Sequence, residues 1–406
     1  MEAGMEFIPS GTVTSAEGFY AGAAYAGIKR KAVDDVLDLG VLFSEAPCQA
    51  TAVFTRNRIK AAPVVLSQRR LRGGRALALV VNSGCANACT GDRGLRDAAR
   101  MAQLAAEGLG ILPEDVVVAS TGVIGKRLPM GQISRAISQI VLSRDGGHNL
   151  ARAMMTTDTV PKEMAVAIKV GDSRFTIGGV AKGSGMIHPD LGTLLCFLAT
   201  DAAVDIAFLR RALRRAVDVS FNMVSIDGDT SPNDTVLIMA DGLAGNEPIA
   251  GDSGLAGVFQ QALDQVCIFL AKCIARDGEG ASRLIGVTVG GAPNVAQARR
   301  AARAVVSSSL VKAAVHGGDP NWGRIVAAVG RSGVRVVESK IDLSIGDVRV
   351  LSAGRPLPFD RRGLVRILNA DEVPIALQLN LGTATATAWG CDLSEEYVTI
   401  NSKYMT

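Results

Sequence analysis

A Gly-Thr dipeptide between a glycine-rich loop and an apolar stretch is the feature of this chain most directly tied to chemistry. It lies in KGSGMIHPDLGTLLCFLATDA, residues 182–202, where Gly192 precedes Thr193. A threonine released as a new N-terminus carries nucleophile and base together, because its α-amine, with an ordinary pKa of about 7.7 to 8.0, can accept the hydroxyl proton. Glycine reaches the twisted backbone that an N-to-O acyl shift needs. We therefore predict self-cleavage at Gly192/Thr193. The alternative is a purely structural role, in which the two residues form a turn before a buried strand.

A second segment, STGVIG at 120–125, has the composition of an oxyanion-binding loop. Acyl transfer through a threonine ester forms a tetrahedral oxyanion that needs preorganised hydrogen-bond donors. Gly122 and Gly125 allow the backbone to expose consecutive N–H groups after a strand, and Thr121 adds a hydroxyl. Without further information the same residues also suit an ordinary strand-ending turn.

Predicted strands and helices surround these segments. Residues 76–84 and 115–122 read as apolar strands that end in polar, glycine-containing loops, and 95–110 has a helical composition between them. Residues 164–183 predict two strands joined at Gly171 and Asp172, and 193–202 predicts a buried strand that begins at Thr193 itself.

The rest of the chain continues this mixed pattern. Helices are expected near 205–218, 253–275 and 294–315, and strands near 235–240, 284–290, 341–351 and 375–381. The order is not strictly alternating, so we predict an α+β protein with packed sheets covered by helices.

Composition limits the class of partner. The chain has 406 residues, 48% of them hydrophobic, and a net charge of +4 from 43 basic and 39 acidic side chains. This balance, with 4% aromatic residues, argues against a nucleic-acid partner. The N-terminus lacks a signal-peptide pattern and no uninterrupted apolar run reaches about 18 residues, so we expect a cytoplasmic protein with no membrane partner. The seven scattered cysteines suit reduced thiols.

Three candidate ligand-binding patterns are weak. Asp227, Asp229 and Asp234 cluster within eight residues, but the ligand order and closing Glu of an EF-hand are missing. GGDPNWGR at 317–324 lacks the spacing of a phosphate loop, and the three histidines show no metal-binding spacing. We therefore predict no metal site and assign no histidine a catalytic role.

The segment around Thr193 resembles the processing site of the ornithine acetyltransferase / N-acetylglutamate synthase family of arginine biosynthesis. Seven further blocks follow the family's order: VNSGCANACTG (81–91), ASTGVIG (119–125), TTDTVPK (156–162), SIDGDTSPNDTV (225–236), RDGEGAS (276–282), GGDPNWGR (317–324) and EYVTINSKYMT (396–406). Matches spread over nearly the whole chain cannot arise by chance.

The resemblance implies a four-layer α-β-β-α sandwich like that of N-terminal-nucleophile hydrolases, self-cleaved into an α chain of residues 1–192 and a β chain of residues 193–406. Both pieces would contribute strands to one core, with room for a smaller α/β lobe from about residue 284. The implied assembly is an α2β2 heterotetramer.

The implied activity is glutamate N-acetyltransferase, in which Thr193 takes acetyl from N-acetylornithine and passes it to glutamate without a cofactor. Some family members also use acetyl-coenzyme A, and the sequence leaves that open. Gly192 replaces a more common alanine, Asp190-Leu191 replaces Asn-Met, and Cys85 stands where a polar residue is expected. These departures leave open a paralogue that acetylates a different amino acid in a specialised pathway.

Site roles follow from the same resemblance. Thr121 and Gly122 match the oxyanion hole, with Thr193 as nucleophile and acetyl carrier. The substrate-binding positions correspond to Thr159, Lys182, Thr193, Glu279, Asn401 and Thr406. Lys182 suits a carboxylate and Glu279 suits the ornithine ammonium. By residue type alone, each of these positions is explained equally well as an ordinary loop, strand-end or chain-terminal residue with no contact to substrate.

Two rival functions belong to other classes. An N-terminal-nucleophile aminopeptidase or amidase would pass the acyl group to water. An unprocessed binding protein would keep Thr193 as a purely structural residue.

Overall fold

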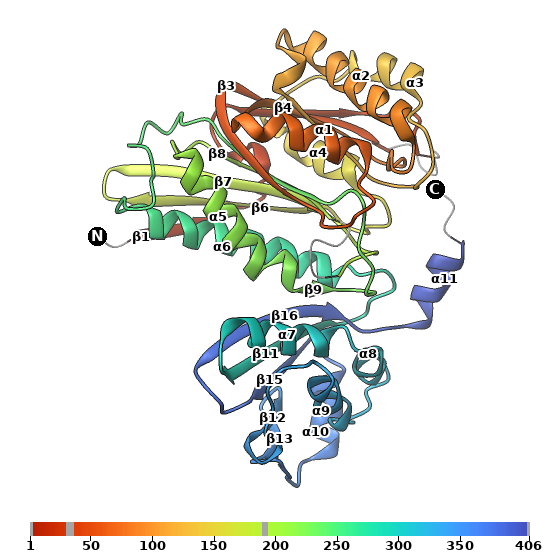
Figure 1. Cartoon of the computed structure of the whole chain (residues 1–406), viewed down its shortest axis with the longest axis vertical. Helices are drawn as coiled ribbons and strands as arrows, with labels where there is room; N and C mark the ends of the chain where they lie inside the picture. Colours follow the sequence, from red (N-terminus) through yellow and green to blue (C-terminus); the bar gives the residue numbers. More distant parts are fainter. Residues whose placement is uncertain (1–2, 30–35, 189–193, 404–406) are drawn as a thin grey trace.

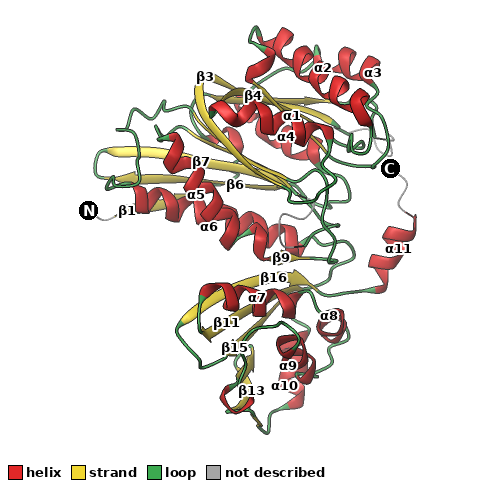
Figure 2. Cartoon of the chain, viewed as in Figure 1, coloured by secondary structure: helices red, strands yellow, loops and turns green. Residues whose placement is uncertain are grey.

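The computed structural model describes residues 3–29, 36–188 and 194–403. Within these residues the larger sheet has nine strands in the order β1-β6-β7-β8-β10-β3-β4-β5, with β2 paired to β3 (Figures 1 and 2). The strands are β1 (Ala3–Phe7), β2 (Phe19–Ala24), β3 (Leu39–Phe54), β4 (Arg75–Asn82), β5 (Val116–Ser120), β6 (Lys162–Val170), β7 (Ser173–Lys182), β8 (Leu195–Thr200) and β10 (Thr235–Ala240).

The long strand β3 connects two halves of this sheet. Its N-terminal part pairs with β2, its C-terminal part pairs with β10, and its ladder with β4 shifts register between Phe43 and Cys48. An apolar core fills the space between the halves, with Leu79 of β4 packed in the same cluster as Phe197 of β8. Helix α4 (Gly147–Met154) adds Leu150 to that core. The folded sheet therefore makes two layers of strands.

Helices cover both outer faces (Figure 1). On one side α1 (Ala62–Arg70), α2 (Gly91–Leu109) and α3 (Met130–Ile137) cover β4 and β5, and Met101 of α2 joins the cluster that contains Val80. On the other side α6 (Ala256–Arg276) covers β6 and β7, and its Leu263 joins the cluster that contains Ile177. Helix α5 (Ile206–Val219) packs beside it, against α6 and β3. The predicted four-layer α-β-β-α sandwich is confirmed.

In the larger sheet β8 and β10, which follow the predicted cleavage point, lie between strands that precede it. β7 pairs antiparallel with β8, and β3 pairs antiparallel with β10. The division into chains 1–192 and 193–406 stays a prediction, but each piece would leave unpaired strand edges if separated from the other.

A second sheet forms the lower lobe in Figure 1. In the described residues it has seven strands in the order β14-β13-β12-β15-β11-β16-β9. They are β9 (Val224–Ser225), β11 (Leu284–Ala292), β12 (Asp342–Ile345), β13 (Val348–Ser352), β14 (Arg355–Pro356), β15 (Glu372–Gln378) and β16 (Ala384–Cys391), with helices α7 (Val295–Val306), α8 (Ser309–His316), α9 (Gly323–Gly330) and α10 (Arg361–Leu368). Helix α11 (Glu395–Lys403) leads back toward the upper sheets.

Among the described helices, α6 alone has the length and hydropathy of a membrane span. Its most hydrophobic window is 56% buried, and Phe259, Leu263 and Leu270 are fully buried. The helix contacts β6 and β7 on one side and β16 on the other. Its hydropathy is accounted for by this position between the two sheets.

Three predicted elements differ from the structure. The helix expected over 294–315 is two helices, because Ser307 ends α7 and the Ser308 side chain accepts from the Val311 N–H at the start of α8. The strand expected over 341–351 is a hairpin that turns at Gly346, where φ is +60°. In the described residues β8 begins at Leu195.

Candidate active site

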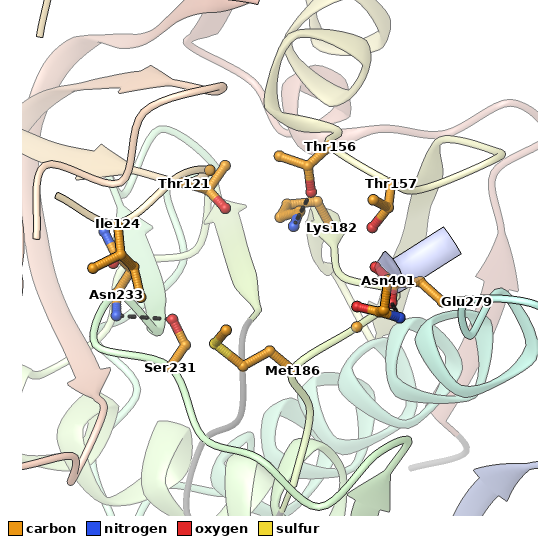
Figure 3. A pocket seen from close by; sticks show the side chains of 12 residues that line it. Thr121, Ile124, Thr156, Thr157, Lys182, Met186, Ser231, Asn233, Glu279 and Asn401 are labelled. Carbon is orange, nitrogen blue, oxygen red and sulfur yellow. Dashed lines mark hydrogen bonds between the residues drawn. The ribbon is translucent and has the colours of Figure 1, made fainter. Parts of the chain in front are cut away.

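A pocket of about 140 Å³ lies where several strand ends of the larger sheet meet helix α11 (Figure 3). Its walls come from the loop after β5, the segment before β6, the end of β7, the loop before β10, the turn after α6, and α11 itself. The lining residues are Thr121, Gly122, Ile124, Thr156, Thr157, Lys182, Gly185, Met186, Ser231, Asn233, Glu279 and Asn401. Five residues that the sequence predicted for the site therefore share one pocket: Thr121, Gly122, Lys182, Glu279 and Asn401.

The loop after β5 presents two free donors. The Thr121 N–H donates to the Asn82 carbonyl at 3.0 Å, and the Gly125 N–H donates to the Ala88 carbonyl at 2.9 Å. The expectation that Gly125 exposes its N–H is therefore wrong. Within the described residues the Thr121 hydroxyl and the Gly122 N–H have no hydrogen-bond partner. These two groups are the available donors for an oxyanion.

Gly122 is required by the shape of this loop. Its φ is +126°, and a Cβ at this position would lie 2.4 Å from the carbonyl carbon of Gly84. Any larger residue would displace one backbone segment from the other. The close contact with 84–85 fixes the direction of the Gly122 N–H.

Lys182 is 2% exposed and ends β7 inside the pocket. Its Nζ donates to Thr156 Oγ1 at 2.7 Å and lies 3.7 Å from a carboxyl oxygen of Asp158. Burial lowers the pKa of Lys182, and the Asp158 charge opposes that shift. The side chain is thus held in one position with its amine at the pocket wall.

Asp158 is the centre of a buried ionic network beneath this wall. Its carboxyl accepts from Lys162 Nζ at 2.7 Å, the Gly183 N–H at 2.6 Å and the Thr156 N–H at 3.0 Å. Burial by itself would raise the pKa of Asp158, but Lys182 and then Lys162 outweigh it and hold that pKa well below its usual value. Lys162 also donates to Asp277 at 2.6 Å, which ties this network to the turn that carries Glu279.

Thr159 is not brought into the pocket. Its hydroxyl donates to Asp277 Oδ1 and its N–H donates to Asp277 Oδ2 at 3.0 Å. Thr156 and Thr157 of the same segment line the pocket instead. A substrate contact at Thr159 stays a prediction, and Thr156 is the better-placed threonine.

Glu279 and Asn401 lie on the side of the pocket across from Ile124 and Asn233 (Figure 3). The Asn401 amide donates to Glu279 Oε2 at 2.7 Å, which links the turn after α6 to α11. A Cβ at Gly185 would lie 2.4 Å from the Glu279 carboxyl carbon, so Gly185 leaves the space that this carboxylate occupies. The pocket lining thus offers a cation at Lys182 and a carboxylate at Glu279.

Three predicted residues, Gly192, Thr193 and Thr406, lie outside the described residues. The next described residue after the predicted cleavage point is Leu194, whose N–H donates to Asp234 Oδ1 at 3.0 Å. Thr235 at the start of β10 donates its N–H to the Leu194 carbonyl at 3.2 Å.

Sequence reasoning missed part of the lining, including Thr156, Met186, Ser231 and Asn233. Two of these, Ser231 and Asn233, belong to the aspartate-rich block that suggested a weak metal site. Its carboxyls instead serve two different segments: Asp227 accepts from the Ile187 N–H at 2.9 Å, while Asp234 accepts from Leu194. The described part of the chain holds no group of three or more His, Cys, Asp or Glu side chains arranged for a metal ion.

Residues 20–406 match the profile of the ArgJ family. The chain belongs to the ArgJ family. It is 50% identical over 406 residues to an arginine biosynthesis bifunctional protein ArgJ from Dehalococcoides mccartyi, with 100% of both chains covered. It is 52% identical to the protein of that name from Symbiobacterium thermophilum, covering 99% of this chain and 100% of the relative.

A solved structure of an ArgJ-family protein also matches. It is an arginine biosynthesis bifunctional protein from Bacillus halodurans, 44% identical, with a TM-score of 0.50. The match covers 98% of that solved chain but 51% of this one. The family predicted from the sequence blocks is confirmed.

Proposed function

We propose that this ArgJ-family chain is a glutamate N-acetyltransferase that moves acetyl from N-acetylornithine to glutamate through an acetyl ester on Thr193. The main support is that one pocket brings together the free donors of Thr121 and Gly122, the amine of Lys182 and the carboxylate of Glu279. The names of the relatives, which are bifunctional proteins of arginine biosynthesis, support the same pathway.

The charges of the pocket match the donor substrate. N-acetylornithine carries one carboxylate and one side-chain ammonium, while its acetamide is neutral. Lys182 and the neighbouring Thr156 hydroxyl would bind the carboxylate, and Glu279, oriented by Asn401, would bind the ammonium. This orientation directs the acetamide toward Thr121 and Gly122.

The reaction then follows two balanced halves. Thr193 Oγ attacks the acetamide carbonyl while its α-amine takes the proton, and the oxyanion receives hydrogen bonds from Thr121 and Gly122. Collapse breaks the C–N bond, the proton passes to the leaving nitrogen, and ornithine departs. The α-amine of glutamate then attacks the acetyl ester, and the same two donors bind the second oxyanion. N-acetylglutamate leaves as Thr193 Oγ regains its proton.

Maturation is part of the proposal. Scission between Gly192 and Thr193 would give an α chain of residues 1–192 and a β chain of residues 193–406, assembled as an α2β2 heterotetramer in the cytoplasm. The length of the Bacillus halodurans chain supports the division into two chains, since nearly all of it matches about half of the present chain. We include acetyl-coenzyme A as a second donor, in keeping with the bifunctional names of the relatives.

Two measurements test the proposal. Intact mass of the purified protein should show two chains that divide at Thr193, and Thr193→Ala should give a single 42.2 kDa chain without transfer. Wild-type enzyme should convert N-acetylornithine and glutamate to ornithine and N-acetylglutamate. Release of acetate without N-acetylglutamate would indicate a hydrolase, and transfer to another amino acid in preference to glutamate would indicate a paralogue of a specialised pathway. An active Thr193→Ala protein would overturn the mechanism.

A further inference from the structure

Two adjacent residues before β10, Asn233 and Asp234, join the oxyanion loop to the chain that follows the proposed nucleophile. The Asn233 amide nitrogen donates to the Ala86 carbonyl at 2.6 Å and to the Ser120 carbonyl at 2.8 Å. Both partners are carbonyl oxygens, so the orientation of the amide is determined. Ser120 directly precedes Thr121, and the N–H of Ala86 donates to the Val123 carbonyl at 3.0 Å. Asn233 therefore holds both sides of the oxyanion loop.

Asp234 holds the other reacting element. Its Oδ1 accepts from the Leu194 N–H at 3.0 Å, and Leu194 is joined by one peptide bond to Thr193. The parallel ladder of β8 and β10 starts immediately afterwards, at Leu195 and Thr235. The side-chain bond thus extends the ladder by one residue toward the cleavage point.

Both side chains occupy costly positions. Asn233 is 4% exposed and Asp234 is 1% exposed, and Asn233 Oδ1 and Asp234 Oδ2 are buried with no hydrogen-bond partner in the described residues. Burial raises the pKa of Asp234 well above its usual value, against the hydrogen bond from Leu194. An apolar pair would avoid the cost of burying unpaired oxygens, so packing does not account for these residue types.

We propose that Asn233 and Asp234 are positioning residues that set the distance between the oxyanion donors and the nucleophile-bearing chain. The inference rests on the proposed function. Because the two side chains are consecutive on one strand end, movement of either element relative to the other would require breaking one of these bonds. Small displacements of reacting groups cost large factors in rate, so the effect should be on kcat rather than on KM.

The test compares variants of full-length enzyme by intact mass and by steady-state acetyl transfer from N-acetylornithine to glutamate. Asp234→Ala removes the acceptor for Leu194 and should lower kcat about 100-fold with KM changed by less than about threefold. Asp234→Asn keeps an oxygen acceptor in place and should retain kcat within about tenfold of wild type. Asn233→Ala should lower kcat about 100-fold as well, because it releases the oxyanion loop.

Asp201→Ala is the matched control. Asp201 is also buried at a strand end and accepts two backbone N–H groups, from Thr176 at 2.6 Å and Glu17 at 3.1 Å, but it does not line the pocket. Its kcat should remain near that of wild type.

Three results would overturn the inference: kcat within threefold of wild type in Asp234→Ala, an equal loss in Asp201→Ala, or a loss of about 100-fold in Asp234→Asn. The last result decides the matter even if Asp234→Ala does not fold. Wild-type enzyme that transfers no acetyl would instead overturn the proposed function, so the two failures are distinguishable.

Discussion

Lys182 donates a 2.7 Å hydrogen bond to the hydroxyl of Thr156. This contact joins the end of β7 to the segment before β6 and places a buried amine at the pocket wall. Asp158, two residues after Thr156, lies on the inner side of the same amine. The amine is therefore held between a structural carboxylate and the open pocket.

Lys182→Met should preserve the fold and weaken substrate binding. Lys162 still neutralises Asp158 in this variant, so the free energy of unfolding should change by no more than about 2 kcal/mol. Loss of the cation should raise the KM for N-acetylornithine by about 10- to 100-fold. Lys169→Met, on the exposed side of β6, is the control for loss of one positive charge. An unchanged KM would contradict the assignment of Lys182 to the carboxylate.

Lys162→Met should damage stability more than any other change in this network. Lys162 bridges Asp158 and Asp277 in a buried position, and its removal leaves carboxylate charge uncompensated, at a cost of about 3–5 kcal/mol. The low pKa of Asp158 makes its ion pairing stabilising above about pH 4, the unfolded-state pKa, and that stabilisation is lost on acidification. Urea unfolding should therefore show a difference from wild type that narrows below pH 4.

Gly122→Ala should abolish most of the activity. The new Cβ would lie 2.4 Å from the Gly84 backbone at a residue with φ of +126°, so the loop must move. Misplacement of one oxyanion donor should lower kcat by about 10²–10³-fold. Gly125→Ala is the control, because its Cβ would meet nothing within 4 Å and the only cost is backbone strain at a φ of +81°. Comparable kcat losses in both variants would contradict this account.

Glu279→Gln should separate the two half-reactions. The amide can still accept from Asn401, but it lacks the charge that would bind the ornithine ammonium. We expect the KM for N-acetylornithine to rise about 10-fold or more, while the KM for glutamate, which has no side-chain ammonium, changes little. Half-reaction kinetics with each substrate measure this directly. An equal effect on both substrates would exclude a role specific to the ammonium.

Asp241→Asn should stabilise the protein at alkaline pH. Burial, with a contribution from Asp201, raises the pKa of Asp241 to about 7. A raised carboxyl pKa means that the folded state keeps a proton that the unfolded state has lost, so wild-type stability falls between about pH 4 and pH 7. Solvent screens part of this effect because Asp241 is only half-buried. We expect the free energy of unfolding of the variant to exceed that of wild type by about 1 kcal/mol at pH 8 and to differ little at pH 4. Urea titrations at the two pH values measure it.

Many of the elements were predictable because they carry local signals, whereas the four-layer arrangement was expected only from the family resemblance. Alternating apolar runs predicted β6 and β7, and the helical composition of 95–110 predicted most of α2. The long strand β3 was missed, since Ser-Glu-Ala-Pro at 44–47 interrupts its apolar pattern just where its ladder with β4 shifts register. The break between α7 and α8 was missed because two serines act there as caps, which is a local hydrogen-bonding effect.

The amino-acid sequence alone determined the family and the residue types at the proposed reacting positions, since both are carried by short contiguous blocks. Only the tertiary structure decided that Thr156 rather than Thr159 lines the pocket, and that Asn233 joins the loop at Ser120. Thr156 and Thr159 are the same type of residue, three positions apart in the sequence, but their side chains lie in different surroundings. Only the packing of distant strands decides which of the two faces the pocket.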